Sequence, residues 1–373
     1  MPGPLRFGWY IPTHGDGATV GDPATFIPPT PELFLRVAKA AEVAGFEYCL
    51  VPVLATCWDA WVVTAMVSAQ TERMTMLVAA RPGLIAPTVS AKMVSTFDQM
   101  SRGRIAVNLI AGGGAAEMAA DGVYFDHDAR YEVIDEAVQL MKATWAAEGT
   151  MDWQGGHYRV DGALVRPRTY QRPHPPFYIG GISPAAIDTG AKHADVYMLW
   201  GNTPEQIARD IATVRERAAL YGKADSLRFC MRLQVLVRET NAQAGRDAEA
   251  LIATATANAR ASRLTGVGAE SQADGRMREF ARTTAENNYW IRPNLWAGLT
   301  TVRHGAGVMM VGGPGEVAAL IQEYIDVGCT EFCLSGYTHD AEAERFGRMV
   351  MPFFRERLAE PRYLAARPDF DPR

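Results

Sequence analysis

Residues 176–210, PFYIGGISPAAIDTGAKHADVYMLWGNTPEQIARD, carry the clearest signal of the fold class. Two short apolar runs, Pro176–Gly181 and Asp195–Gly201, have the length and composition of buried strands. The segment between them, Pro184–Lys192, has the period of a helix, and a second helix opens at Thr203-Pro204-Glu205. Buried strands that alternate with helices in this way are typical of a parallel sheet built from βα units.

The same alternation continues in both directions along the chain. One of the flanking helices is Pro31–Ala44, which has a proline at its start and Gly45 directly after it. The predicted strands are Arg6–Pro12, Tyr48–Val53, Thr75–Arg81, Arg104–Ala111, Pro176–Gly181, Asp195–Gly201, Arg228–Arg238 and Glu331–Tyr337. Eight βα repeats in 373 residues predict an α/β fold, a (β/α)8 TIM barrel with insertions, as one domain over residues 1–373. An open, doubly wound sheet is the alternative.

Two segments exceed a minimal barrel. Gly149–His174 has the pattern of a small hairpin followed by a proline-rich loop. Ala257–Arg303 begins as a polar stretch and ends in the aromatic run NNYWIRPNLWAG. A long polar insertion anchored by tryptophans predicts a mobile lid over residues 257–303.

Composition excludes several classes of protein. Lys and Arg number 37 against 42 Asp and Glu, so the formal net charge of −5 does not favour nucleic acid or anionic lipid as a partner. No apolar run reaches the roughly 18 residues of a membrane span, and the N-terminus lacks a signal pattern, so we expect a cytoplasmic protein. The five scattered cysteines predict reduced thiols, and the seven histidines show no metal-ligand spacing.

Reactive groups of a (β/α)8 barrel lie at the C-terminal ends of its strands. The candidate residues at these ends are His14, Cys57, Arg81, Asn108, Gly181, Ser183, Trp200, Tyr337 and His339. Within the strand MRLQVLV, Arg232 and Gln234 share one face, and an inward guanidinium needs an anion. A structural carboxylate would satisfy it equally well, but Arg303 from a distant segment makes a two-arginine clamp on one oxyanion a second interpretation.

Two further candidates remain open at this level. The run Gly180-Gly181-Ile182-Ser183 leads from a strand into a helix, where backbone N–H groups hold a phosphate or simply make a turn. Neither the dinucleotide nor the Walker fingerprint is present. Cys57 has no partner that suggests a triad, which favours packing or pocket lining over a nucleophilic role.

An ordered set of motifs extends over nearly the whole chain. In order they are FGWYIPTHGDG, ATCWDAWVVTA, VAARPGLIAPTVSAK, STFDQMSRGRIAVNLIAGG, DGVYFDHDARYE, PPFYIGGIS, YMLWG, RLQVLVRETN, NLWAGLTTVRHGAG and CLSGYTH. Together they resemble the bacterial luciferase-like flavin monooxygenases, and most closely the FMNH2-dependent alkanesulfonate monooxygenases.

The resemblance implies a two-component monooxygenase. Reduced FMN would come from a separate NAD(P)H-dependent FMN reductase, O2 would be the co-substrate, and an organosulfonate would be cleaved to an aldehyde and sulfite. The resemblance also implies a homo-oligomer, a dimer or tetramer. The residues that match the family's substrate and flavin neighbourhood are Cys57, Trp200, Arg232, Arg303 and Tyr337, with Gln234 at a substituted position. Those that match its cofactor contacts are His14, Asn108, Tyr131, Gly181 and Ser183.

One departure from the family pattern concerns charge. The alkanesulfonate enzymes have histidine where this chain has Gln234, and glutamine cannot become cationic or carry a proton near neutral pH. Leu54-Ala55-Thr56 and Trp58 also add apolar bulk beside Cys57. Both changes predict a larger or less charged substrate than a simple alkanesulfonate. The alternatives are a luciferase-like monooxygenase with a non-sulfonate substrate, a deazaflavin (F420) dependent oxidoreductase, and a flavin-storage barrel without turnover.

Overall fold

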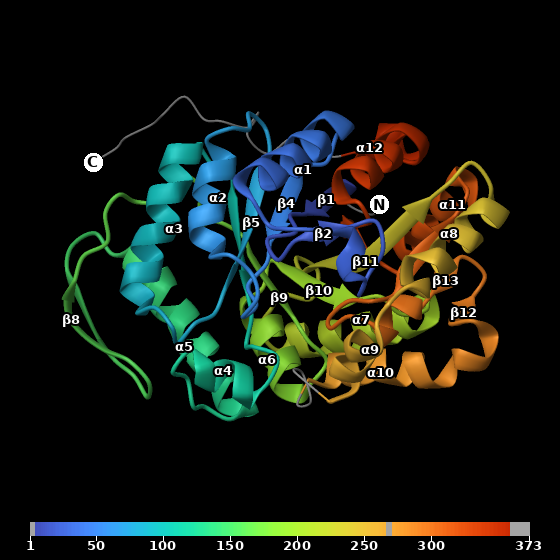
Figure 1. The fold of residues 1–373 in the computed structure, drawn as a ribbon. Coiled ribbons are helices and arrows are strands. Elements are labelled where there is room, and N and C mark those ends of the chain that lie inside the picture. The colour runs from blue at the N-terminus through green and yellow to red at the C-terminus, as the bar shows by residue number, and fades with distance from the viewer. Residues whose placement is uncertain (1–3, 266–270, 359–373) are drawn as a thin grey trace.

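Eight parallel strands close into a barrel in the computed structural model, which describes residues 4–265 and 271–358 (Figure 1). Their bounds are β1 Arg6–Tyr10, β4 Tyr48–Val51, β5 Thr75–Ala80, β6 Ile105–Leu109, β9 Phe177–Gly180, β10 Val196–Trp200, β11 Arg228–Val237 and β15 Glu331–Ser335. The strand order is β10-β9-β6-β5-β4-β1-β15-β11, and β10 pairs with β11 from Val196↔Arg228 to Trp200↔Arg232. This last pairing closes the sheet, so the predicted barrel is confirmed and the open sheet is wrong.

Helices surround the barrel (Figure 1). Outside residues 257–303 they are α1 Pro31–Ala44, α2 Ala60–Ser68, α3 Pro87–Ser101, α4 Ala115–Ala120, α5 His127–Ala146, α6 Pro184–His193, α7 Pro204–Ala219, α8 Asn241–Ala253, α11 Pro314–Asp326 and α12 His339–Met349. At α1 the Thr30 hydroxyl accepts from the Leu33 amide, and Gly45 ends the helix with φ 97°. The apolar pattern of the sequence predicts one helix over Glu342–Arg357 near the C-terminal end. In the structure α12 starts at His339 and stops at Met349, and a 3-10 segment, Met351–Arg357, follows it with proline in its first turn.

The first insertion is the expected hairpin. Strands β7 Met151–Gln154 and β8 Arg159–Ala163 pair in antiparallel fashion and project from the barrel at the left of Figure 1. The Glu136 carboxylate on α5 accepts from Trp153 Nε1 at 3.0 Å and from the His157 amide at 2.7 Å. These hydrogen bonds fasten the hairpin to the helical layer.

The second insertion forms helices and a small sheet. It contains α9 Ala257–Thr265, α10 Gln272–Thr283, β12 Trp290–Arg292 and β13 Leu295–Trp296; the part of the predicted lid at 266–270 lies outside the described residues. Strand β11 is long enough to pair with β15 and then with β14 Met309–Gly312, on which β13 packs in antiparallel fashion. Trp296 is fully buried under this layer. The aromatic end of the insertion is therefore an anchor, as its composition predicts.

The barrel interior is filled below the site. Tyr48, Leu77, Tyr178, Val196 and Cys230 belong to one buried cluster inside the strands. The Tyr178 hydroxyl donates to Glu331 at 2.6 Å. Space for a ligand is left at the opposite end, where the strands terminate. None of the helices in the described ranges is long and apolar enough to cross a membrane.

Candidate active site

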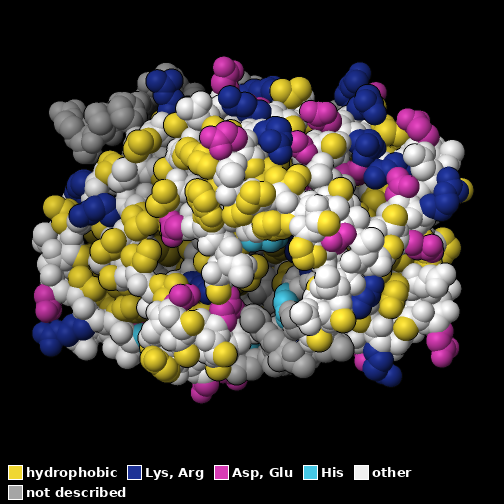
Figure 2. Space-filling model, in the orientation of Figure 1, with side chains coloured by type: hydrophobic (Ala, Val, Ile, Leu, Met, Phe, Trp, Pro, Cys, Tyr) yellow, Lys and Arg dark blue, Asp and Glu magenta, His cyan; other side chains and the backbone are white. Residues whose placement is uncertain are grey.

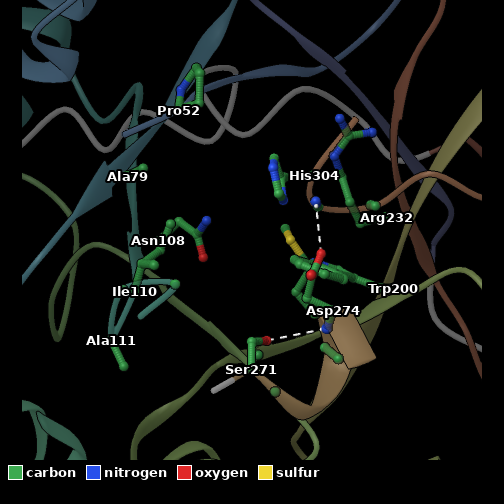
Figure 3. A pocket seen from close by; sticks show the side chains of 18 of the residues that line it. Pro52, Ala79, Asn108, Ile110, Ala111, Trp200, Arg232, Ser271, Asp274 and His304 are labelled. Carbon is green, nitrogen blue, oxygen red and sulfur yellow. Dashed lines mark hydrogen bonds between the residues drawn. The ribbon is translucent and has the colours of Figure 1, made fainter. Parts of the chain in front are cut away.

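A cavity of about 280 Å³ lies over the C-terminal ends of the strands. Its walls include Asn108 from β6, Trp200 from β10 and Arg232 from β11, together with Asp274 near the start of α10 (Figure 3). In the space-filling view the molecule is hollowed at this place (Figure 2). Six of the predicted site residues line the cavity: Asn108, Tyr131, Gly181, Trp200, Arg232 and Arg303.

Arg232 is buried on the inner face of β11, with 4% of its surface exposed. Its Nη1 donates to the backbone oxygens of Leu233 and Cys333, and its Nη2 donates to Ser335 Oγ at 2.9 Å. The guanidinium also lies over the Tyr10 ring, 4.9 Å from its centroid. No carboxylate of the described residues pairs with it, so the structural ion pair left open by the sequence is not found there.

Arg303 faces the same cavity from the segment after β13. Its Nη1 donates to the Tyr337 hydroxyl at 3.0 Å, and its Nε donates to the His304 backbone oxygen at 3.2 Å. Among the described residues Arg303, like Arg232, has no carboxylate partner. The structure thus brings both predicted arginines to one cavity, and Tyr337 acts on it through Arg303.

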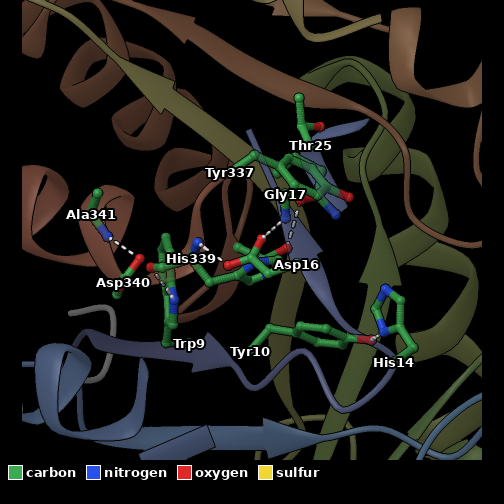
Figure 4. A network of polar contacts seen from close by, with 12 residues as sticks. Trp9, Tyr10, His14, Asp16, Gly17, Thr25, Tyr337, His339, Asp340 and Ala341 are labelled. Carbon is green, nitrogen blue, oxygen red and sulfur yellow. Dashed lines mark hydrogen bonds and ion pairs between the residues drawn. The ribbon is translucent and has the colours of Figure 1, made fainter. Parts of the chain in front are cut away.

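Asp16 and His339 form a buried pair (Figure 4). The sequence predicts His339 at a strand end but gives no connection between it and Asp16. Asp16 lies in the two-residue strand β2, Asp16–Gly17, which pairs with β3, Phe26–Ile27. Its carboxylate accepts from the His339 amide and contacts His339 Nδ1, both at 2.8 Å. Burial alone would raise the pKa of Asp16, but the charge and hydrogen bonds of His339 lower it. The acid within THGDG and the strand-end histidine were the available signals.

The Asp16–His339 pair supports rings that touch both arginines. The His339 ring lies 5.7 Å from the Tyr10 ring and 5.3 Å from the Tyr337 ring. Tyr10 lies under the Arg232 guanidinium and Tyr337 accepts from Arg303. The pair therefore fixes two aromatic supports of the cationic wall.

His14 and Cys57 lie beside the cavity rather than on its wall. His14 Nδ1 is 3.5 Å from the Tyr10 hydroxyl, and burial, together with the charges of Arg303 and His339, lowers its pKa to about 4. Burial likewise raises the pKa of the Cys57 thiol. Near neutral pH both side chains are uncharged.

Tyr131, Gly181 and Ser183 converge at the start of α6. Gly181 has φ 145°, and a Cβ at this position would lie 2.5 Å from the Ala186 Cβ and 3.2 Å from the Tyr131 hydroxyl. Ser183 Oγ accepts from the Ala186 amide and caps the helix. Burial raises the pKa of Tyr131 to about 12, so it stays a neutral hydrogen-bond donor. A tight glycine turn, a helix N-terminus and two hydroxyls can hold a phosphate.

Arg81 and Glu117 form a buried ion pair on the wall of the cavity that lies across the barrel from Arg232. Arg81 Nη2 donates to Glu117 Oε1 at 2.5 Å, and Glu117 Oε2 accepts from the Gly113 amide at 3.1 Å. Asp121 adds a longer contact at 3.3 Å. The sequence indicated Arg81, at the end of β5, but not Glu117. The available signal for Glu117 was its position in α4, four residues after Gly113 and shortly after the neighbouring strand β6.

Helix α10 of the predicted lid supplies part of the cavity wall. Asp274 Oδ1 accepts from the Gly305 amide at 3.3 Å, and Ser271 Oγ accepts from the Asp274 amide (Figure 3). Arg276 reaches α7 and donates to both oxygens of Asp210, at 2.6 and 3.2 Å. The insertion therefore covers the cavity, as expected of a lid.

Gln234 does not reach the cavity. Its side chain is fully buried; Nε2 donates to the Ala306 oxygen at 2.9 Å and Oε1 accepts from Ser335 at 2.6 Å. Of the apolar residues around Cys57, Leu54 lines the cavity, whereas Trp58 packs edge-on against Phe34, with ring centroids 5.3 Å apart. Neither Gln234 nor Trp58 is therefore placed to contact a substrate in the cavity.

Residues 5–331 match the family model described as Luciferase-like monooxygenase. Three solved structures share the barrel. One is riboflavin lyase (RcaE) with modified FMN and riboflavin, which is 22% identical over 96% of this chain and 93% of that chain, with a TM-score of 0.77. Another is long-chain alkane monooxygenase (LadA), which is 18% identical over 100% of this chain and 94% of that chain, with a TM-score of 0.77. The third is the F420-dependent tetrahydromethanopterin reductase of Methanopyrus kandleri, which is 17% identical over 94% of this chain and 99% of that chain, with a TM-score of 0.66.

Proposed function

Because the chain belongs to the luciferase-like monooxygenase family, we propose that it oxygenates a small organic anion with reduced FMN and O2. The favoured substrate class is an organosulfonate, cleaved to an aldehyde and sulfite. A separate NAD(P)H-dependent FMN reductase would supply the reduced flavin. The proposal places the substrate between Arg232, Arg303 and helix α10.

One observation carries this proposal: the cavity holds two arginines without carboxylate partners among the described residues. Arg81 is neutralised by Glu117, and Arg276 by Asp210. Within the part of the chain that the structure describes, Arg232 and Arg303 donate to neutral groups only, namely backbone oxygens and the hydroxyls of Ser335 and Tyr337. Two such cations in a largely buried wall favour an oxyanion, since a buried charge needs a compensating partner.

The residues of this chain fit FMN at the other side of the cavity. Tyr131, Gly181 and Ser183 would hold the phosphate at the start of α6, and Asn108 would hydrogen-bond the ring system. Bound reduced FMN supplies the electrons that activate O2 for transfer to the substrate. The chain itself binds and orients the two reactants.

Exclusion of water is the second task of the residues around the cavity. Helix α10 lies over it, held by the Asp274–Gly305 and Arg276–Asp210 contacts. Trp200 and Met277 give this part of the wall an apolar surface. A closed, partly apolar chamber protects reactive species from hydrolysis. It also strengthens the electrostatic attraction between an anion and the two arginines, Arg232 and Arg303, because less water screens their charges.

The proposal is tested by anaerobic titration with reduced and with oxidised FMN, followed by O2 and a panel of linear alkanesulfonates while sulfite is assayed. We expect tighter binding of the reduced flavin and sulfite release. Arg303→Met should raise KM for the sulfonate by about tenfold or more, the ratio that corresponds to one lost charge-assisted hydrogen bond. The control is Arg282→Met, which removes an exposed cation of α10 that pairs with Glu279.

Other outcomes discriminate the alternatives. Reduced-flavin binding and O2 consumption without sulfite would keep the monooxygenase and reject the sulfonate. Reduction of a substrate by F420H2 without O2 uptake would favour the deazaflavin oxidoreductase, whose fold this chain also shares. Flavin binding with neither activity would favour a storage barrel.

A further inference from the structure

We propose that Gln234 and Ser335 are positioning residues, which connect Arg232 to the cavity segment 303–306 through one chain of hydrogen bonds. The proposal deepens the proposed function, because it assigns a role to residues that support the anion-binding wall without touching the ligand. We call this Arg232–Ser335–Gln234–Ala306 series the donor chain. It also gives the neutral glutamine a task in place of direct contact with a substrate.

The donor chain runs in one direction. Arg232 Nη2 donates to Ser335 Oγ at 2.9 Å, Ser335 Oγ donates to Gln234 Oε1 at 2.6 Å, and Gln234 Nε2 donates to the Ala306 oxygen at 2.9 Å. Each acceptor becomes the donor of the next bond, and the first donor is a cation. Hydrogen bonds arranged in this way polarise one another, so the bonds strengthen as a set.

The barrel geometry places the chain where it joins two walls. Gln234 is paired in register with Ser335 on β15 and with Met309 on β14. It therefore lies at the point of β11 where the pairing with β15 ends and the pairing with β14 begins. Arg232 lies two residues earlier on the same inward face. The side chain of Gln234 therefore spans from the strand that carries Arg232 to the segment that carries Arg303.

Both ends of the donor chain line the cavity, whereas its two middle members do not. Gln234 and Ser335 are fully buried, and Gln234 uses its amide nitrogen and its oxygen inside the chain. Next to Ala306, Gly305 donates to Asp274 of α10. The inner arginine, the segment with the second arginine and the covering helix are thus held by consecutive hydrogen bonds.

A buried glutamine with a merely structural role would not need to connect Ser335 to the cavity segment 303–306. Loss of the Gln234 amide should free Ala306 and let segment 303–306 open more often, while loss of the Ser335 hydroxyl should leave Arg232 Nη2 and Gln234 Oε1 without their partners. The two changes remove the two partners of the hydrogen bond between Ser335 and Gln234. Both should weaken anion binding, but the first should affect the mobility of segment 303–306 more.

The test compares Gln234→Leu, Ser335→Ala and the control Ser95→Ala in the full chain. Ser95 is also a fully buried serine, but its hydroxyl donates to Lys92 within α3, outside the cavity. The first readout is amide hydrogen exchange of segment 303–306 without any ligand. The second is calorimetric titration with inorganic sulfate and a linear alkanesulfonate.

We expect exchange in segment 303–306 at least about tenfold faster in Gln234→Leu than in the wild type or Ser95→Ala. Affinity for the anions should fall about tenfold in Gln234→Leu and Ser335→Ala, the ratio expected for one buried hydrogen bond. Gln234→His should restore both properties at pH 8. A neutral imidazole has one donor for Ala306 and one acceptor for Ser335.

Failure of this inference and failure of the proposed function are distinguishable. If exchange in segment 303–306 is the same in Gln234→Leu and in Ser95→Ala, the donor chain does not position that segment and the inference is wrong, whatever the enzyme binds. If exchange rises as expected but the wild type binds neither sulfate nor the alkanesulfonate, the donor chain stands and the anionic substrate is rejected. A variant that does not fold is replaced by Gln234→Met, and the same comparison decides.

Discussion

Replacing Glu117 by glutamine should destabilise the protein by ~3 kcal/mol. The side chains of Arg81 and Glu117 are 1% and 2% exposed, so the change leaves a buried guanidinium without its closest counter-charge. Removing one partner of a buried pair costs about 3–5 kcal/mol. The lower end applies here because Asp121 remains 3.3 Å from Arg81 Nη1 and the Val53 oxygen 3.4 Å from Nη2.

Urea unfolding at constant pH measures this loss. The control Glu279→Gln removes the carboxylate from an exposed pair with Arg282 and should leave the midpoint unchanged, because exposed pairs contribute little. The double variant Arg81→Met with Glu117→Leu should recover most of the stability, since it removes both charges together. A Glu117→Gln midpoint equal to that of Glu279→Gln would refute the reasoning, because it would mean that solvent or Asp121 already compensates Arg81.

Three further predictions follow from burial and pKa. Burial raises the pKa of Asp98 from 3.8 to about 6 although Gln171 donates two hydrogen bonds to it. Its protonated form therefore stabilises the fold below about pH 4, and this contribution is lost as pH rises through about 6. Between pH 4 and pH 7.5, the free energy of unfolding of the wild type should fall by ~2 kcal/mol relative to that of Asp98→Asn, as measured by urea unfolding. The His14 imidazole, with its pKa lowered to about 4, should show no NMR titration between about pH 5.5 and pH 8, and an inflection near 6.5 would contradict the burial argument. Iodoacetamide should alkylate Cys57 more slowly than a free thiol at pH 7.5, as monitored by mass spectrometry, because burial raises its pKa; a faster reaction would reveal a thiolate.

The barrel could be predicted from sequence because its signals are local. All eight strands occur where short apolar runs stand, and α1 begins and ends at the predicted Pro31 and Ala44. Its boundaries are set by Thr30 and Gly45, which act through their own backbone and side-chain chemistry. The C-terminal helix was predicted less well because the 3-10 segment after Met349 keeps an apolar pattern close to that of an α-helix.

The site could be predicted only where strand ends identify it. Arg232 and Arg303 face one cavity, as the clamp interpretation requires. Arg232 is placed there by its position on a barrel strand, and Arg303 by its position directly after the insertion. Asp16, Glu117 and Ser335 could not be found this way. Each acts through a partner more than 30 residues away, and pairwise contacts of that range are not encoded in local periodicity.

Gln234 shows why residue type alone was an incomplete guide to the charge of the site. The sequence suggested that glutamine, where the family has histidine, lowers the charge that a substrate meets in the site. The structure instead puts Gln234 inside the donor chain, where the nitrogen and the oxygen of its side-chain amide are both hydrogen-bonded. A neutral residue at this position keeps Arg232 and the 303–306 segment in place without responding to pH, because an amide neither gains nor loses a proton. Among the described residues, the cations that line the cavity without a carboxylate partner are then Arg232 and Arg303.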